Sequence, residues 1–552
     1  MAKLYCKHSD GWGGIVANLE LANAHDEVII ESGDYYGEET LKIPSNISLL
    51  GNSGTSLHSN ASSIIEICGK NIHVESLNFF AAVTAPRSQC QIFIHDSFNI
   101  SVKNLFLDGY LSAGIGLKVI TSEGVLINKC SVCQFLSAGI FLCGSYGEIS
   151  QNQCSKNQIG IVLSLSWSSE KIICTIYNNR CHNNNSNGIV IQSANVDLAA
   201  NECWGNKGSG FVISTEDDQA ENVGYSSIKN NISHSNGMYG IAVDTVDAKI
   251  SNNECWGNKN CGIAIHNSLN YYSGLVGFSG NLLATFKLIV ENNKSHDNYI
   301  HGIIIESAVV KLMNNECWDN KHNGIAVHTN YDISKLTANV IAENNLSHGN
   351  ALDGFGINSA VAKLYNNECW NNDRCGFDFE SFENDSLVVT NIIAVNNSSH
   401  SNGRHGALVS GANVDLVDNK FWNNKHSGLI INSEIGEIAG VTGNNNFSYN
   451  NGNYGIGVNE YFNKVELVNS KCRNNGIDFF PTAPTNKVNF NISGEKWVWN
   501  IDSEKILSQQ LKGKLLKLWL LNKITSRPIS LHTSPKIRLL AFWPFEYHIR
   551  SP

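Results

Sequence analysis

One repeated position in the sequence carries side chains that could move protons. It ends runs such as GIAIH, GIIIE and GIAVH, and in the middle of the chain it is ionisable, as Asp244, His266, Glu306, His328 and Glu380. Neighbouring imidazole and carboxylate groups can act as general acid and base. We predict His328 as the base or acid, Glu306 as its orienting partner, and the other three as secondary members. The alternative is an ordinary row of charges that solvates an exposed strand.

A second repeated position alternates between tryptophan and histidine. Flat aromatic rings can stack on sugar rings, which predicts a binding ladder on one face of the protein. The alternative is that neighbouring rings stack on one another, because a feature that recurs in every repeat is typical of a structural role. The tryptophans of this ladder are Trp204, Trp256, Trp318, Trp370 and Trp422.

A short acidic stretch could hold a cation. Its carboxylates are Asp378, Glu380, Glu383 and Asp385, and carboxylate oxygens are the ligands that Ca²⁺ prefers. We therefore name Ca²⁺ as the ion that this spacing would bind. Nothing else in the sequence indicates a cofactor, so none is expected to be required.

These positions recur because the chain repeats one phrase, N-x-C/S-W/H-x-N-x-x-x-G-I. Copies such as NECWGNKNCGI alternate with copies such as NKSHDNYIHGI, at spacings of 22 and 30 residues, with ten extra residues between Trp256 and His296. Such a unit is too short for a helix pair, and the run after each glycine alternates with the period of a strand. No proline lies between Pro86 and Pro481, as strands hydrogen-bonded on both sides require. The sequence predicts stacked parallel strands.

The third position of the phrase is small in nearly every copy, which predicts a buried column along the stack. Asparagines flank it, and asparagine suits sharp bends because it tolerates left-handed backbone and its amide can bond to the coils above and below. The glycine before each strand indicates a special backbone angle or close approach of the next coil. The column reads Cys130, Cys154, Cys181, Cys203, Ser233, Cys255, Ser295, Cys317, Ser347, Cys369, Ser399, Phe421, Ser448 and Cys472.

Composition excludes several classes of protein. The net charge of −10 and the lack of a basic stripe argue against a nucleic-acid partner. No segment is apolar over the length of a membrane span, and the N-terminus lacks the apolar run of a signal peptide. We therefore expect no transmembrane segment and, by default, a cytoplasmic location, with secretion by another route left open. Many of the sixteen cysteines occupy the small repeat position, which favours buried thiols over disulfides.

The repeats resemble those of the pectin-lyase-like right-handed parallel β-helix superfamily, in the group called carbohydrate-binding and sugar-hydrolase repeats. The stretch Glu27–Asn52, EVIIESGDYYGEETLKIPSNISLLGN, also resembles the opening coil of that family. The resemblance implies an all-β fold, a right-handed single-stranded parallel β-helix or solenoid with terminal caps. It covers most of the chain.

We expect three regions. Residues 1–45 would form an N-terminal cap, with a helix near 15–24, and an opening strand. Residues 46–496 would form the β-helix repeats. Residues 497–552 are basic, and the segment 506–524 reads as an amphipathic helix that covers the last coil or contacts a membrane surface or a partner.

The ends of three strands also resemble the Gly-aromatic-Asp-Pro-His phrase that carries catalytic residues in mannuronan C5-epimerases and related lyases. They are GFDFE, GIAIH and GIAVH. Here no single coil holds both the aspartate and the histidine, and the proline is missing.

The resemblance implies a protein that acts on or binds polysaccharide, as a lyase, an epimerase or a hydrolase. Whether the chain is an enzyme at all stays open. One alternative is a non-catalytic glycan-binding rod. Another is an intracellular protein-interaction scaffold, the role of the same repeats in substrate-recognising F-box proteins. The sequence leaves the sugar, the linkage and the reaction open.

Overall fold

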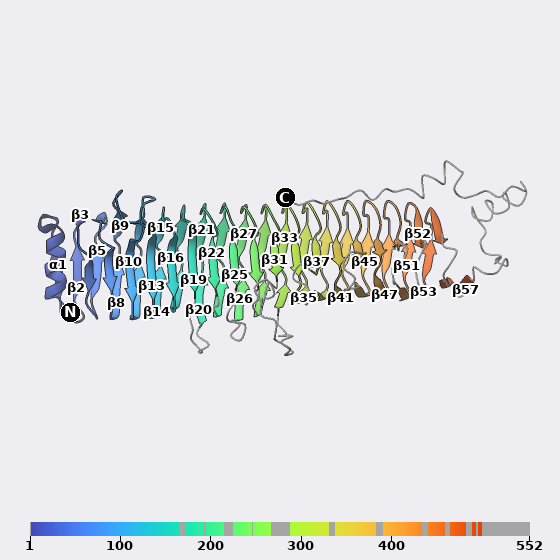
Figure 1. Cartoon of the computed structure of the whole chain (residues 1–552), viewed down its shortest axis with the longest axis horizontal. Coiled ribbons are helices and arrows are strands. Elements are labelled where there is room, and N and C mark those ends of the chain that lie inside the picture. The colour runs from blue at the N-terminus through green and yellow to red at the C-terminus, as the bar shows by residue number, and fades with distance from the viewer. Residues whose placement is uncertain are drawn as a thin grey trace, which may run out of the picture. The chain divides into compact units, whose positions relative to one another are not determined.

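The repeats form a stack of coils in which the strands between Lys3 and Ile492 pair in parallel with the equivalent strands of neighbouring coils. The chain divides into two units, Met1–Val498 and Trp499–Pro552, and the coils belong to the first. In Figure 1 the strands of this unit follow one another along the molecule. The computed structural model describes residues 2–164, 173–192, 195–214, 225–244, 247–266, 288–329, 337–381, 390–432, 440–458, 464–481, 488–492 and 495–499.

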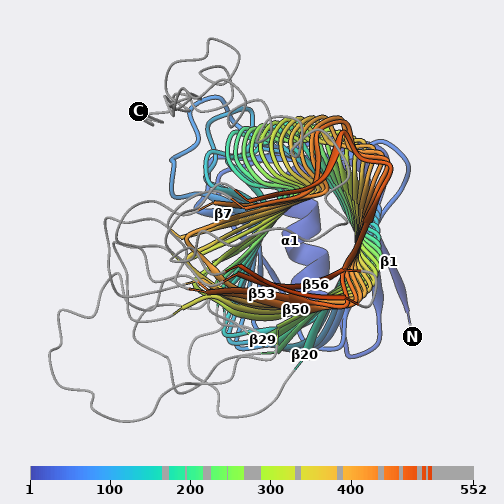
Figure 2. The same cartoon turned by 90° about the vertical axis from the view of Figure 1, so that its right-hand side faces the viewer.

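Each repeat contributes one strand to each of three sheets, and the view along the stack in Figure 2 shows the sheets as walls around a common interior. Sheet A contains β1 (Lys3–Cys6), β2 (Glu27–Ile30), β5 (Ser48–Gly51), β8 (Lys70–Glu75), β11 (Phe98–Lys103), β14 (Glu123–Asn128), β17 (Tyr146–Ser150), β20 (Ile173–Tyr177), β23 (Asn195–Ala199), β26 (Tyr225–Lys229), β29 (Asp247–Ser251), β32 (Leu288–Glu291), β35 (Val309–Met313), β38 (Asn339–Glu343), β41 (Val361–Tyr365), β44 (Asn391–Val395), β47 (Asn413–Val417), β50 (Gly440–Asn444), β53 (Lys464–Val468), β56 (Val488–Ile492) and β57 (Glu495–Trp499).

Sheet B is made of short strands that carry the Trp/His position. It contains β3 (Gly33–Gly37), β6 (Thr55–Ser59), β9 (Asn78–Ala81), β12 (Phe106–Asp108), β15 (Ser131–Cys133), β18 (Gln153–Ser155), β21 (Arg180–His182), β24 (Glu202–Trp204), β27 (Ile232–His234), β30 (Glu254–Trp256), β33 (Lys294–His296), β36 (Glu316–Trp318), β39 (Leu346–His348), β42 (Glu368–Trp370), β45 (Ser398–His400), β48 (Lys420–Trp422), β51 (Phe447–Tyr449) and β54 (Lys471–Arg473).

Sheet C is made of the strands that follow the glycine of the phrase, and it carries the ionisable position at its strand ends. It contains β4 (Leu41–Ile43), β7 (Ser63–Ile67), β10 (Cys90–His95), β13 (Ile115–Ile120), β16 (Ala138–Cys143), β19 (Ile159–Ser164), β22 (Ile189–Gln192), β25 (Phe211–Ser214), β28 (Ile241–Asp244), β31 (Ile263–His266), β34 (Ile303–Glu306), β37 (Ile325–His328), β40 (Phe355–Asn358), β43 (Phe377–Glu380), β46 (Ala407–Ser410), β49 (Leu429–Asn432), β52 (Tyr454–Val458) and β55 (Ile477–Pro481).

The interior is filled by aliphatic side chains at alternate strand positions, together with the predicted small column. That column is buried from Cys154 to Ser448, and Cys472 at its end is partly exposed. The position predicted for Cys130 is wrong. Val132 pairs with Cys154, whereas Cys130 lies two residues earlier, where its backbone N–H donates to Asn152 Oδ1 at 2.8 Å. The irregular spacing of the early coils hides this offset from sequence alignment.

The predicted role of the asparagines is confirmed, and it is divided between neighbours. Asn252 adopts the left-handed conformation at the bend, with φ of 55°. Its successor Asn253 is buried, and its Nδ2 donates to Asn293 Oδ1 at 3.0 Å and to the carbonyl oxygen of Ile228 at 2.9 Å. Asn258 and Asn298 form the matching contact at the next bend, at 3.0 Å. Because these amides satisfy one another from coil to coil, their polar atoms are buried with hydrogen-bond partners.

A helix covers the first coil, as predicted, although its bounds differ from those expected near 15–24. A short 3-10 turn, η1 (His8–Asp10), leads into α1 (Gly11–Leu21), which lies across the end of the interior in Figure 2. Its buried side chains are Trp12, Ile15 and Leu19. Parallel pairing has already begun here, because β1 pairs with β2 and β2 with β5.

Several sequence predictions fall on residues outside the described ranges. They concern Glu383 and Asp385 of the acidic stretch and the segment 506–524. Among the helices that the structure describes, none has the length and apolar character needed to span a membrane.

The buried column predicts how the thiols react. Cys255, Cys317 and Cys369 have no exposed surface, and burial raises the pKa of each of these thiols. Since the thiolate is the reactive form, we expect these three cysteines to resist a thiol reagent in the native protein, while exposed Cys68 reacts at once. Mass spectrometry of labelled peptides before and after denaturation measures this. Rapid native labelling of all three would refute the inward column.

Candidate functional site

The members of the predicted ionisable row occupy successive rungs of sheet C. Register pairs Asp244 with His266, His266 with Glu306, and Glu306 with His328. Asn358 then separates His328 from Glu380. Equivalent positions in adjacent parallel strands lie about 4.8 Å apart, so coil stacking brings together residues that are up to 40 positions apart in the chain.

Glu306 bridges two histidines. Its Oε2 lies 2.5 Å from His266 Nδ1, and its Oε1 lies 2.8 Å from His328 Nε2. The side chains of His266 and Glu306 are each 23% exposed and that of His328 is 35% exposed, so solvent or a ligand can reach the trio. We call His266, Glu306 and His328 the bridged trio.

The electrostatics of the bridged trio keep its carboxylate ionised. Burial alone would raise the pKa of Glu306, but the hydrogen bonds from His266 and His328 lower the pKa well below its usual range. Each imidazole donates one N–H to this carboxylate. The other ring nitrogen, Nε2 of His266 and Nδ1 of His328, then carries the lone pair when the ring is neutral.

An apolar patch on the outer face of sheet C adjoins the trio and lowers the local dielectric constant, which strengthens its charge interactions. Tyr239 packs on this patch, and its ring meets that of His266 edge-on at 5.6 Å. Burial raises the pKa of Tyr239 to about 12, so its hydroxyl is a proton donor at neutral pH. The buried members of the patch are Cys261, Ala264, Ile304 and Ala326.

A second charged cluster lies farther along the same sheet. Arg374 Nη2 is 3.0 Å from Asp378 Oδ2, and Nη1 is 3.6 Å from Asp353 Oδ2. Burial and the charges of Asp353 and Glu380 raise the pKa of the Asp378 carboxyl. Within the described ranges, Asp378 Oδ1 and Arg374 Nε are buried without a hydrogen-bond partner.

This arrangement bears on the expected calcium ion. Arg374 already provides a positive charge for Asp378, and a guanidinium there competes with a metal ion for the carboxylate. Two of the four proposed ligands, Glu383 and Asp385, lie outside the described residues. The calcium site stays a prediction.

Sequence reasoning missed the residues that lie just before each glycine of the phrase. Tyr239, His301, Asp353 and Arg374 all come from that part of the coil, one or two residues before the glycine. The repeat alignment carries the signal that could have found them, because these columns, like the strand-end column, become ionisable in the middle coils.

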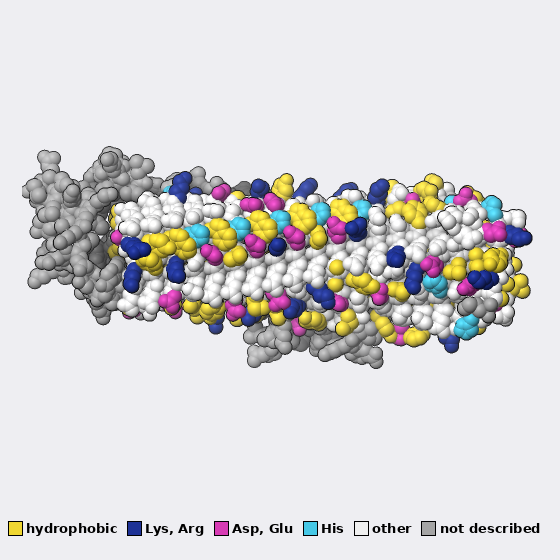
Figure 3. All heavy atoms as spheres, turned by 180° about the vertical axis from the view of Figure 1, so that it is seen from behind, with side chains coloured by type: hydrophobic (Ala, Val, Ile, Leu, Met, Phe, Trp, Pro, Cys, Tyr) yellow, Lys and Arg dark blue, Asp and Glu magenta, His cyan; other side chains and the backbone are white. Residues whose placement is uncertain are grey.

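The Trp/His ladder forms the other regular feature, a continuous stripe of alternating hydrophobic and histidine side chains in Figure 3. His296 stacks on Trp318 with ring centroids 4.1 Å apart and planes 10° apart. Trp256 lies on its other side, at 5.8 Å and 5°. Glu254 adds a charge contact, with its Oε1 3.4 Å from His296 Nε2.

The ladder geometry favours the structural alternative. The ring faces contact one another, so a ligand that approaches the stripe meets ring edges instead of free faces. Stacking on sugar rings by Trp204, Trp256, Trp318, Trp370 and Trp422 stays a prediction.

His301, a partly buried histidine beside the trio, predicts a pH dependence of stability. Burial lowers the pKa of His301 to about 3, whereas an unfolded histidine titrates near pH 6.5. Between these values the unfolded chain binds a proton that the folded chain does not, so stability should fall as the pH is lowered from about 6.5 towards 3. One such group contributes up to about 1.4 kcal/mol per pH unit.

The test is the melting temperature of the wild-type protein and of His301→Asn across this range. We expect a shallower slope in the variant. Glu306, whose pKa is lowered, adds to the loss of stability only below about pH 4.3, so the comparison is made above that pH. Parallel slopes in the two proteins would contradict the assignment.

A known family model matches the middle part of the chain. Residues 167–275 and 282–438 match the family model described as right handed beta helix region. No curated protein sequence matches the chain.

Solved structures that resemble the chain do so at low identity. A double mutant of the periplasmic alginate epimerase AlgG is 14% identical with a TM-score of 0.35, over 67% of this chain and 83% of that chain. The A-module of the Azotobacter vinelandii mannuronan C-5 epimerase AlgE6 is 15% identical with a TM-score of 0.29, over 87% and 93%. The catalytic unit of a GH87 alpha-1,3-glucanase from Streptomyces thermodiastaticus strain HF3-3 is 11% identical with a TM-score of 0.23, over 87% and 69%.

The fold expected from the repeats is confirmed by the stacked parallel sheets and by the family match. The chain folds as a right-handed parallel β-helix.

Proposed function

We propose that this protein is an enzyme that acts on an acidic polysaccharide by removing the proton from a sugar carbon next to a carboxylate. The observation that carries the proposal is the bridged trio, in which one ionised carboxylate holds two imidazoles and all three side chains are partly exposed. Charged side chains that only solvate a surface do not need to contact one another across neighbouring rungs in this way. The cluster is also local, unlike the Trp/His ladder.

The substrate class is supported by two arguments. The repeats resemble carbohydrate-binding and sugar-hydrolase repeats, which favours a glycan. The row also runs along successive rungs of sheet C with partly exposed side chains, so that a linear polymer could contact several coils.

The geometry suggests how the step would proceed. His328 accepts the proton at Nδ1 while Glu306 holds its Nε2–H and stabilises the imidazolium that forms. The resulting anion can accept a proton on the other face of the ring from Tyr239 or from the imidazolium form of His266, which is epimerisation. Alternatively it expels the glycosidic oxygen, which takes the proton of one of these two donors as it leaves, and this is β-elimination.

Charge must be stabilised where the anion develops. Arg374 belongs to the coil of Glu380, two rungs beyond that of His328, and its side chain is 31% exposed. It is therefore a candidate for contact with a substrate carboxylate. Asp244 and Glu380 remain secondary members of the row.

A panel of acidic and neutral polysaccharides tests the proposal. The assay measures unsaturated-product absorbance, new reducing ends, and deuterium incorporation from D₂O at the sugar carbon. Deuterium incorporation without cleavage would indicate an epimerase, and an unsaturated product would indicate a lyase. Reducing ends without either signal would overturn the proton-abstraction step in favour of hydrolysis. Binding without turnover would leave a glycan-binding rod, and neither binding nor turnover would favour the protein scaffold.

A further inference from the structure

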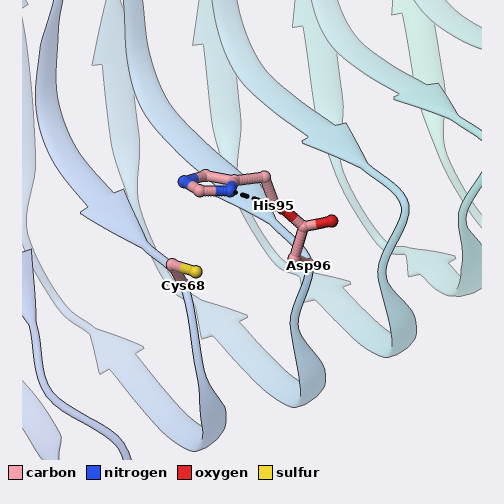
Figure 4. A group of neighbouring side chains, drawn as sticks. All are labelled: Cys68, His95 and Asp96. Atoms are coloured by element: carbon pink, nitrogen blue, oxygen red, sulfur yellow. Dashed lines mark hydrogen bonds and ion pairs between the residues drawn. The ribbon is translucent and has the colours of Figure 1, made fainter.

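The outward row that contains the bridged trio continues towards the N-terminus and meets a second group of reactive side chains. The register of sheet C carries the row from His266 through seven rungs to His95, a distance of about 34 Å at 4.8 Å per rung. Cys68 occupies the preceding rung, directly after β7. Figure 4 shows Cys68, His95 and Asp96 side by side at these strand ends.

The ligand atoms of these three residues converge. One atom from each, the thiol sulfur, a ring nitrogen and a carboxylate oxygen, lie within 4.8 Å of one another. In the part of the chain that the structure describes, this is the one group of three or more His, Cys, Asp or Glu side chains that meets this condition. Tetrahedral zinc ligands lie about 3.4 Å apart, given bonds of roughly 2.0–2.3 Å. Rotation of the exposed Cys68 side chain can bring its sulfur to this distance from the other two ligand atoms.

The surrounding contacts orient the same atoms. His95 Nδ1 and Asp96 Oδ2 face each other at 3.0 Å, close to the separation of two ligands of one ion. The second polar atom of each of these two side chains contacts a different residue. Thr121 Oγ1 donates to Asp96 Oδ1 at 2.7 Å, and His95 Nε2 lies 3.0 Å from Glu66 Oε1. A carboxylate on the far nitrogen is the usual support of a metal-binding histidine, because it fixes the tautomer that leaves the other nitrogen free to bind.

We propose that Cys68, His95 and Asp96 bind a zinc-type divalent ion, with Glu66 as the positioning residue for His95. A thiolate and an imidazole select Zn²⁺ or Co²⁺ over Ca²⁺ or Mg²⁺, which prefer oxygen ligands. Three protein ligands leave the fourth position of a tetrahedral ion open to water or to a ligand. The site is independent of the proposed polysaccharide activity.

Co²⁺ is the probe, because its thiolate complexes absorb in the near ultraviolet and its tetrahedral complexes absorb strongly in the visible. The reduced full-length protein is titrated with Co²⁺ and then with Zn²⁺. We expect one Co²⁺ per chain and a thiolate charge-transfer band. One equivalent of Zn²⁺ should displace the Co²⁺ and so remove the band. Absence of the band, or binding of Ca²⁺ in preference to Zn²⁺, would overturn the proposal.

Matched variants locate the site. Cys68→Ser should abolish the charge-transfer band, and His95→Gln should abolish tight binding. Cys143→Ser is the control, since Cys143 lies on the same row two rungs beyond His95, and it should leave the band unchanged. Glu66→Gln should weaken binding by about 10- to 100-fold without removing the band. A band that survives Cys68→Ser, or one that is lost in Cys143→Ser, would place the ion elsewhere and refute the assignment.

Discussion

Replacing His328 with alanine should reduce turnover of the polysaccharide substrate by about a hundredfold or more, because loss of a general acid or base costs about 10²- to 10⁴-fold. The melting temperature should change little. The side chain is 35% exposed, and Glu306 keeps its hydrogen bond to His266 when His328 is removed. Steady-state rates and thermal unfolding of the same preparation measure both effects.

Two further variants make the His328 result specific. Ser410→Ala changes a non-ionisable member of the same row, in register with Glu380, and it should retain full activity. Trp318→Ala removes one ring of the ladder and should leave the rate constant for turnover close to that of the wild-type protein. Full activity in His328→Ala together with loss in Trp318→Ala would move the site to the ladder and leave the row as ordinary surface.

Replacing Gly324 with valine should destabilise the protein by about 1–3 kcal/mol or more, the usual range for overpacking a filled interior. A Cβ atom at Gly324 would lie 1.9 Å from Ser347 Oγ and 2.7 Å from Asn350 Nδ2 in the next coil. Ser347 cannot easily move away, because its hydroxyl donates to the carbonyl oxygen of Gly354 at 2.8 Å. Glycine is therefore required here because neighbouring coils approach closely, and not because of a special backbone angle. This is the second of the two reasons expected from the sequence.

The control for Gly324→Val is Gly13→Ala in α1, where an added Cβ would meet nothing within 4 Å. Alanine should match or exceed glycine there, because it favours the helix by about 1 kcal/mol. The loop residue Asn330, at which we also expect substitution to be tolerated, lies outside the described residues. Equal melting temperatures for Gly324→Val and Gly13→Ala would show that the coil contact is misplaced.

Much of the candidate site was predictable because a parallel stack turns sequence spacing into spatial order. Once the repeats are aligned, each coil adds one rung, and residues at the same repeat position must be neighbours. This is why the repeat alignment alone places Glu306 between His266 and His328. The same reasoning failed at Cys130, where the coils vary in length and the repeat phrase is absent.

The spacing of the repeat is enough to predict the fold, the inward column and the order of the ionisable row. All three follow from the two-residue period of the strands and from the asparagine that marks each bend. The folded chain was needed to show which turn residues lie on sheet C, where Tyr239 meets His266 and Arg374 meets Asp378. It was also needed to show that the ladder rings face one another, and that Cys68 meets His95 and Asp96. Such contacts depend on side-chain direction at bends and on the register of irregular coils, and neither is encoded in the spacing of the repeat.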